Sequence, residues 1–454
     1  MADEESRLEA PKEFSRSWLR SERPVARLVA RPVERFLALE AGSASLLMAA
    51  AVVALLWVNV AEGSYEDFWT TKLAIDLGPL EFEEDLRHLV NDLLMAVFFY
   101  VVALEVKREI LFGSLRDPRS AAVPVAAAIG TMVGAAFTYV AINLGGELNG
   151  WAIPIATDIA FALGVLGLAG RRAPPELRAF LLTLAIVDDL GTIAVIGLFY
   201  SSGISVAWLA AAAGLTLGVL LLRHLGVRLL VAYVALAGVM WLAVLESGLH
   251  PTIAGVVLGF LTPALAFHPR RQTGEVIGDQ LTRITQSSDA EVSEATMLET
   301  SRLAREAVSP LARMEEALHP WSAYLILPVF ALANAGVPVS AGELGDALTS
   351  PIGLGIVLGL VVGAPIGGVL LAWLTVRLGP ARVPDGLDWP AIGAVAPLKG
   401  IGFTVAIFIS VLAFDDPALQ AEAKLAILVA SLLAAVLGTV ALRTAAGTDR
   451  PPTG

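Results

Sequence analysis

The sequence predicts an all-α polytopic membrane protein with about twelve transmembrane helices. Of its residues, 56% are hydrophobic and only 16% are charged, with a mean hydropathy of +0.72, whereas soluble proteins carry about 25% charged residues. Apolar segments long enough to cross a bilayer recur along the whole chain. They occupy residues 36–60, 89–112, 119–144, 150–169, 178–200, 205–223, 227–246, 249–266, 319–338, 351–377, 388–413 and 421–443.

The loops between these segments differ in charge. One set is rich in lysine and arginine and comprises the N-terminal tail and residues 107–119, 171–178, 223–228, 267–318, 377–382 and 443–450. The alternate set holds few basic residues and lies near residues 61–88, 145–149, 201–204, 247–248, 339–350 and 414–420. Because basic loops remain in the cytoplasm, we expect both termini to be cytoplasmic. The strict alternation also favours an even number of crossings.

Composition argues against several classes of protein. The chain has no cysteine, which excludes disulfides and thiolate metal sites. Its five histidines are scattered, and its net charge of −12 argues against nucleic acid as a partner. No cofactor is expected. The first apolar segment is too long for the core of a signal peptide, so we expect it to remain as a membrane helix.

The predicted domain organisation is a single membrane domain with polar extensions. Residues 1–35 form a cytoplasmic tail with arginines at three- or four-residue spacing, which fits either an interfacial helix or a solvated tail. The membrane domain covers 36–443 and includes a long cytoplasmic loop at 267–318, and 444–454 form a cytoplasmic tail. Within the loop we expect a flexible first half, helical structure from about 291, and a helix start at Ser309-Pro310.

The first external loop contains TTKLAIDLGPLEFEED, in which apolar residues alternate on both sides of Leu77-Gly78-Pro79. Alternation around a turn signal predicts a short β-hairpin, although an irregular acidic loop is the alternative. A two-stranded ribbon has unpaired edges, so residues 63–86 could pair with the same segment of a second copy and form a homodimer.

Three aspartates dominate the stretch from Trp151 to Tyr200. Asp158 lies in one apolar segment, and Asp188 and Asp189 lie in the next. An acidic side chain at the centre of a membrane helix costs about 2.5–3.5 kcal/mol. Intramembrane carboxylates normally face a cavity on an ion or proton path. We therefore expect an ion site here.

Two of the apolar segments are predicted to be interrupted in the middle of the membrane. Pro154 breaks the first near Asp158 and Thr157, and the second carries APLKGIGFT at residues 396–404. Backbone groups freed at such breaks form ion sites in transporters. Oxygen ligands at a break suit a hard cation such as sodium. Glycines at 355, 359, 363 and 367 predict a close helix contact.

Long motifs of this chain resemble NhaA-type sodium/proton antiporters over about residues 36–443. They are VNDLLMAVFF followed by ALEVKREI, then ATDIAFALG, LAIVDDLGTIAVIGLFY, ESGLHPTIAGVVLGF, LHPWSAYLILPVFALANAGV and GIGFTVAIFI. The resemblance implies twelve helices in a bacterial inner membrane. It also implies inverted repeats of helices 3–5 and 10–12, with helices 4 and 11 discontinuous and crossing.

The resemblance also implies functional residues. Its cation and proton site matches Asp188 and Asp189 with the Thr157-Asp158 pair, so sodium or lithium and protons are the expected partners. Residues that it associates with the response to pH are Glu105, Arg108, Glu109, Glu315, His250 and Asp92.

One position departs from the family pattern. Well-studied members carry a lysine on helix 10 that pairs with the first aspartate, where this chain has Ala364. Lys399 lies instead in the break of helix 11. We hypothesise that Lys399 supplies the missing charge and pairs with Asp188. The alternative is a lysine that extends toward one membrane face.

The expected activity is pH-regulated exchange of cytoplasmic sodium or lithium for external protons, in which both compete for Asp189, Asp188 and Asp158. Asp189 is expected to be the main cation ligand. The main alternative is a proton-coupled solute transporter on the same fold. An intramembrane aspartyl protease, which is expected to carry a GxGD-like element, and a non-catalytic scaffold are more distant.

Overall fold

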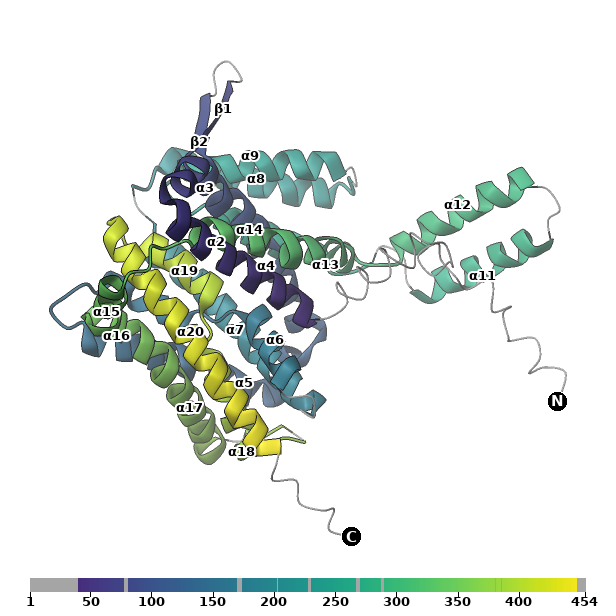
Figure 1. The fold of residues 1–454 in the computed structure, drawn as a ribbon. Helices are drawn as coiled ribbons and strands as arrows, with labels where there is room; N and C mark the ends of the chain where they lie inside the picture. The colour runs from purple at the N-terminus through teal and green to yellow at the C-terminus, as the bar shows by residue number, and fades with distance from the viewer. Residues whose placement is uncertain are drawn as a thin grey trace, which may run out of the picture.

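The computed structural model describes residues 40–446, apart from 77–80, 170–173, 202, 228–229, 267–269, 287–289, 380 and 385. It confirms the predicted all-α membrane fold. Long helices run side by side through one body, a two-stranded ribbon projects from one end, and a helical pair extends to one side (Figure 1). The predicted tail at 1–35 lies outside the described residues, and of the predicted tail at 444–454 only 444–446 are described, as the end of the last helix.

The first half of the chain forms eight segments at the predicted places. They are α2 (Glu40–Trp69); α3 (Leu86–Leu89) continued by the π-helical turn η4 (Val90–Leu94) and α4 (Met95–Phe112); α5 (Pro118–Ile142); η6 (Asn149–Ile155) with α6 (Ile159–Ala169); α7 (Pro175–Phe199); α8 (Val206–His224); α9 (Leu230–Glu246); and α10 (Thr252–Leu261). A short 3-10 turn, η5 (Ser114–Arg116), joins α4 to α5.

The second half supplies four more segments. They are α13 (Pro310–Trp321) with η7 (Ser322–Ile326) and α14 (Leu327–Asn334); α16 (Pro351–Leu358) with η8 (Gly359–Gly363) and α17 (Ala364–Leu378); α18 (Trp389–Val395) with η9 (Ala396–Gly400) and α19 (Phe403–Ala413); and α20 (Pro417–Ala446). A short helix, α15 (Ala341–Thr349), precedes α16 and carries a capping box of Ser340 and Glu343. Within the described residues, eight helices are long and apolar enough to span a membrane, and the bent pair α18–α19 makes nine.

Two predicted boundaries were wrong. The first segment was expected to end near residue 60, but α2 continues to Trp69 across a kink at Ala61 (φ −149°, ψ 66°). The segment expected at 249–266 contains only the ten-residue helix α10. The helix start predicted at Ser309-Pro310 is confirmed, because Ser309 caps α13 by accepting a hydrogen bond from the Ala312 amide at 3.2 Å. From there the helix continues through η7 and α14 into the segment expected at 319–338.

The predicted two-stranded ribbon is present. Strand β1 (Lys72–Asp76) pairs antiparallel with β2 (Glu81–Asp85), with Lys72 opposite Asp85. The predicted turn at 77–80 lies outside the described residues. The ribbon stands clear of the helical body (Figure 1).

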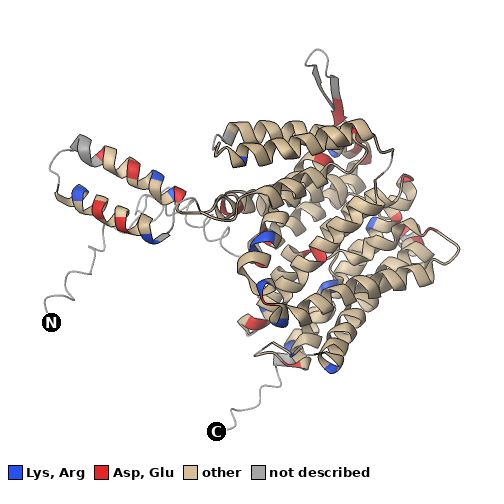
Figure 2. Cartoon of the chain, turned by 180° about the vertical axis from the view of Figure 1, so that it is seen from behind, with Lys and Arg blue, Asp and Glu red and all other residues tan. Residues whose placement is uncertain are grey.

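The loop at 267–318 differs from expectation. Its first half, predicted to be flexible, contains α11 (Arg270–Gln286), which pairs with α12 (Ala290–Glu306). The two helices project from the body, and Figure 2 shows charged residues frequent on them and sparse along the helices of the body. The Thr300 hydroxyl of α12 donates a hydrogen bond to Oε1 of Gln280 on α11 at 2.8 Å, so a polar contact joins the two helices.

A glycine seam joins the two halves of the chain. On α5, a Cβ at Gly134 would lie 2.2 Å from the carbonyl oxygen of Gly363, and one at Gly130 would lie 2.3 Å from that of Gly367. The helices α5 and α17 therefore touch backbone to backbone. The predicted close helix contact is present.

Candidate functional site

Two interrupted helices cross beside α7. The chain leaves η6 at Ala156, runs extended to Asp158 and then enters α6. On the other side, η9 and α19 are separated by Ile401 and Gly402 and meet at 45°. The Asp158 amide donates a hydrogen bond to the Ile401 carbonyl at 2.7 Å. Each break thus satisfies backbone groups of the other, as irregular backbone within a membrane requires.

Asp158 holds the N-terminal ends of both following helices. Its Oδ1 accepts a hydrogen bond from the Phe161 amide at 3.0 Å, at the start of α6. Its Oδ2 accepts from the Thr404 hydroxyl at 2.6 Å and from the Thr404 amide at 3.3 Å, at the start of α19. The side chain is 2% exposed. One carboxylate therefore lies at the positive ends of two helix dipoles, where negative charge is stabilised.

Asp188 is fully buried on α7 and has partners from three other elements. Its Oδ1 accepts from the Thr131 hydroxyl of α5 at 3.1 Å, and its Oδ2 lies 3.4 Å from the Thr157 hydroxyl. Lys399, from η9, forms an ion pair with Oδ2. The Thr157 hydroxyl also lies 3.1 Å from the Lys399 carbonyl. Because that hydroxyl has one proton, it can donate to only one of these two acceptors at a time.

The lysine pairing is a long-range contact between the two halves of the chain. Lys399 is 2% exposed, and the position where the family lysine was expected, Ala364, is also buried at 2% exposure. Ala364 begins α17 directly after the π-helical turn η8. The structure thus places the cation beside Asp188 from the broken helix and an apolar side chain at the start of α17.

Asp189 differs from its neighbour. It is 7% exposed, and within the described part of the chain no hydrogen bond or ion pair to its carboxylate is formed. Successive residues of a helix project about 100° apart, so Asp189 shares the environment of Asp188 without sharing its partners. Its oxygens are available to a cation.

Sequence reasoning missed three hydroxyl residues. Thr131 and Thr404 bind the two other aspartates, as described above. Thr192 is 1% exposed and its hydroxyl has no partner in the described structure. It lies three and four residues after the aspartate pair, on the same side of α7. That helical spacing, and the presence of single hydroxyls in apolar segments, were the signals available in the sequence.

Asp92 and His250 lie together at the N-terminal end of α4. Asp92 is in the π-helical turn η4, and its Oδ1 lies 3.8 Å from Nε2 of His250. Nδ1 of His250 lies 2.9 Å from the Thr252 hydroxyl and 3.4 Å from the Thr252 amide. The ring also contacts Phe408 of α19 edge-on, with 5.1 Å between ring centres.

The predicted charge cluster at the C-terminal end of α4 is only partly assembled. Arg108 of α4 forms an ion pair with Glu315 of α13 at 2.6 Å, and Glu105 lies 3.9 Å from Nε2 of His319. Burial raises the pKa of Glu315 above its usual value, and the Arg108 charge opposes that rise. Glu109 is not part of this cluster.

Glu109 closes the turn after α4. Its Oε1 accepts from the Ser114 amide at 2.6 Å and from the Ser114 hydroxyl at 2.5 Å. The Ser114 hydroxyl also lies 2.6 Å from that of Thr183 on α7. A Cβ on Gly113 would lie 2.1 Å from the Glu109 carboxylate. The side chain therefore stabilises the turn and connects it to the helix that carries the aspartate pair.

The arrangement fits an ion that binds and leaves. Within the described residues, no group of three or more acidic or histidine side chains converges as a tight metal site would require. The oxygens near the crossing come instead from separated carboxylates and hydroxyls of α5, η6, α7 and α19. A weakly held monovalent cation suits such a set better than a resident divalent metal.

The sequence is similar to known sodium/proton antiporters over most of its length. The sequence profile of the family Na+/H+ antiporter 1 matches residues 34–442. The chain is 45% identical to Na(+)/H(+) antiporter NhaA 2 of Myxococcus xanthus, over 92% of this chain and 90% of that protein. It is 43% identical to NhaA 2 of Sorangium cellulosum, over 94% of both. It is 44% identical to NhaA of Oleidesulfovibrio alaskensis, over 92% of this chain and 95% of the relative.

Proposed function

Because this chain belongs to the Na+/H+ antiporter 1 family, we propose that it exchanges sodium or lithium for protons as a secondary transporter. It is a multi-pass bacterial membrane protein. The observation that carries the proposal is the aspartate pair of α7 beside two broken helices, with one carboxylate paired and the other free.

Asp189 is the proposed main cation ligand, because its buried carboxylate has no protein partner in the described structure. Asp188 is the proposed proton carrier and second ligand. Its bonds to Thr157 and Lys399 can be exchanged for a bound cation or a proton without breaking the crossing. Asp158 is proposed to stabilise the crossing, since both of its oxygens hold helix ends. The roles thus divide between ion exchange and architecture.

Exchange follows from competition for the same oxygens. A proton on Asp188 removes the charge that a cation needs, and a bound cation disfavours protonation. Lys399 adds a third competitor, because its ammonium group occupies Oδ2 of Asp188. A cation that approaches Asp188 must displace this ammonium group or share the carboxylate with it. Movement of the site between the two sides of the membrane then couples the opposing fluxes.

The membrane potential contributes to the exchange whenever the numbers of protons and cations exchanged differ, because each net charge moved is worth about 2.3 kcal/mol per 100 mV.

The proposed orientation places both termini in the cytoplasm, according to the positive-inside rule. The ribbon β1–β2 then lies outside the cell. We propose that it pairs with its copy in a homodimer, because two strands alone are marginally stable and leave edges unpaired. The Arg108–Glu315 pair, and Asp92 with His250, are the proposed sites of the pH response.

Reconstituted vesicles test the antiport. We would impose a pH gradient, enclose a pH-sensitive dye, and add sodium, lithium or choline. Sodium and lithium should collapse the gradient with wild-type protein and choline should not. Asp189→Asn should reduce the response at least about tenfold, as expected for a lost charged ligand.

Asp415→Asn is the matched control, because Asp415 is exposed and lies beyond the far end of α19, eleven residues after Thr404. It should behave as wild type. If sodium still triggers proton movement in Asp189→Asn, Asp189 is not the main cation ligand. If neither sodium nor lithium collapses the pH gradient at any pH, the proposed antiport activity is wrong. An organic substrate would then be favoured.

A further inference from the structure

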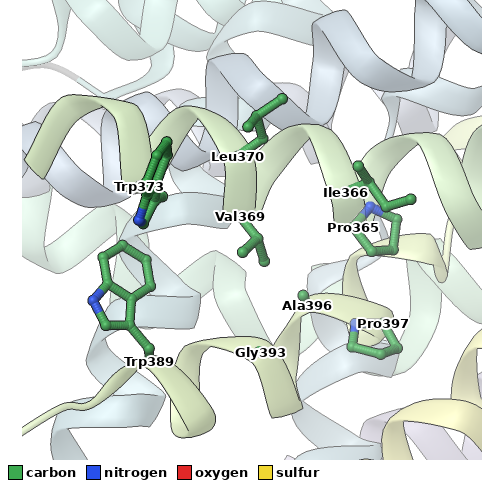
Figure 3. A pocket seen from close by; sticks show the side chains of 9 residues that line it. All are labelled: Pro365, Ile366, Val369, Leu370, Trp373, Trp389, Gly393, Ala396 and Pro397. Atoms are coloured by element: carbon green, nitrogen blue, oxygen red, sulfur yellow. The ribbon is translucent and has the colours of Figure 1, made fainter. Parts of the chain in front are cut away.

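A groove on the outer surface of the helical body has no assigned occupant. It lies between α17 and the segment α18–η9, and its volume is about 590 Å³. Its lining is almost entirely apolar and consists of Pro365, Ile366, Val369, Leu370, Trp373, Trp389, Gly393, Ala396 and Pro397 (Figure 3).

The groove opens toward the membrane. Both of its walls belong to membrane-spanning segments, and Ile366 is 60% and Leu370 51% exposed. No other element of the described chain contributes to its lining. Acyl chains are the apolar material that surrounds such a wall in a bilayer.

The length of the groove matches one half of a bilayer. Pro365 and Trp373 are eight residues apart on α17, which corresponds to about 12 Å along the axis. Half of the hydrocarbon thickness is about 15 Å. The two tryptophans lie at one end of the groove and the two prolines at the other (Figure 3), and tryptophan side chains prefer the level of the lipid headgroups. The groove therefore runs from the membrane surface toward the midplane.

A positive charge lies at the tryptophan end of the groove. The Arg377 guanidinium lies 5.6 Å from the centre of the Trp373 ring, and both Arg377 and Arg382 are exposed. The nearby Asp388 is engaged locally, since its Oδ1 accepts from the Ala391 amide at 2.9 Å. The surface end thus offers the exposed Arg377 cation beside an aromatic platform, and the deep end is lined by apolar side chains.

From this geometry we propose that the groove binds one acyl chain of an anionic phospholipid. The acyl chain runs along the groove from the tryptophan pair to the proline pair, and the phosphate is held by Arg377 and Arg382. The end of the acyl chain nearest the membrane midplane contacts Ala396 and Pro397. These are the first two residues of η9, which also contains Lys399. The lipid thus supports the outer side of an interrupted helix. This inference does not depend on which ion the protein transports.

Gly393 provides a direct test. A Cβ added there meets nothing within 4 Å, so Gly393→Leu fills the groove without a clash. Gly214→Leu is the matched control, because Gly214 is exposed on α8 and also has open space around it. Native mass spectrometry of the full chain in detergent, with phosphatidylglycerol and phosphatidylcholine added together, measures the lipid retained.

The wild type and Gly214→Leu should retain one phosphatidylglycerol, and Gly393→Leu should lose it. Arg377→Gln should lower the preference for phosphatidylglycerol by about fivefold, the effect of one basic residue near an anionic lipid. Glycerol phosphate, which has a headgroup and no acyl chain, should not displace the lipid. Equal retention by both leucine variants, or displacement by glycerol phosphate, would overturn the proposal.

A second measurement avoids any variant that fills space. Phosphatidylglycerol brominated on its acyl chains, titrated in detergent, quenches tryptophans that it contacts. Trp373→Phe should reduce the part of the quenching that saturates at low lipid and leave the share that comes from Trp389 in the same groove. Trp208→Phe should not, although Trp208 is 43% exposed and Trp373 is 42% exposed. An equal loss in the two variants would mean that the lipid has no preferred place.

Discussion

At the scale of single residues, the pairing of Asp188 with Lys399 has the largest energetic consequence. Both side chains are at most 2% exposed. Removing one member of a buried ion pair leaves an unpaired charge and costs about 3–5 kcal/mol, whereas removing both can be nearly neutral. We predict that Lys399→Met and Asp188→Asn each destabilise the protein strongly, and that the double variant is more stable than the sum of the two losses.

Thermal unfolding in detergent measures this coupling through a double-mutant cycle. Lys424→Met is the matched control, because Lys424 is also a buried membrane lysine, at 9% exposure, but lies on α20. The loss of stability in Lys424→Met should simply add to the loss of stability in Asp188→Asn. Additive losses for Lys399 as well would show that the two groups do not interact.

The aspartates could be identified from the sequence, because carboxylates in apolar segments are costly. Thr157 was identified with them, but the hydroxyls of Thr131 and Thr404 could not be assigned to their aspartates. Thr404 is separated from Asp158 by 246 residues and Thr131 from Asp188 by 57. A hydroxyl in an apolar helix normally bonds to the carbonyl four residues earlier, so nothing local indicates which hydroxyl turns to a carboxylate.

At the scale of elements, α4 and α13 are joined by the Arg108–Glu315 ion pair. Burial raises the pKa of Glu315, so this carboxyl gains a proton at a higher pH than an exposed glutamate would. The ion pair therefore exists above that pKa and is lost as the pH falls through it. Arg108 lowers the pKa, so Arg108→Gln should raise it further. We predict that the midpoint of sodium-dependent proton release then moves to higher pH.

The pH profile of dye-loaded vesicles gives this midpoint. Arg313→Gln is the control, because Arg313 is exposed on the same helix α13, and it should leave the midpoint in place. Glu315→Gln should remove the part of the profile that Arg108→Gln shifts. A midpoint that moves to lower pH in Arg108→Gln would contradict the predicted sign.

The membrane segments and their breaks were predictable, but not every other element was. Pro154 and Pro397 indicated both breaks, because proline cannot continue a helical hydrogen-bond ladder. The helix α11 was missed, because Arg270–Gln286 has low hydrophobicity and its apolar residues Val276 and Leu281 are 45% and 52% exposed. The alternation in β1 and β2 was sufficient to predict the ribbon.

At the scale of the whole molecule, the glycine seam between α5 and α17 holds the two halves together. Gly134→Ala would place a Cβ 2.2 Å from a backbone oxygen that no side-chain rotation can move. Overpacking of this kind costs about 1–3 kcal/mol. We predict a lower melting temperature for Gly134→Ala and reduced transport, because the helices around the crossing must separate.

Gly238→Ala is the matched control. Gly238 is exposed on α9, and nothing lies within 4 Å of the position that an added methyl group would take, so alanine should be neutral or slightly stabilising in that helix. Comparison of the two alanine variants in the same detergent separates the cost of the contact from the general effect of replacing glycine. Equal melting temperatures would show that the seam tolerates a wider spacing.

The bonds of Asp158 also constrain how the molecule can move. Its two oxygens hold the first turns of α6 and α19, and its amide is bonded to Ile401. Neither helix can shift alone without leaving a buried carboxylate or amide unsatisfied, which is costly in a membrane. The two half-helices should therefore travel as a single rigid body. Hinges belong elsewhere, and mechanical strain during turnover should concentrate at the outer rim of this unit rather than at its centre.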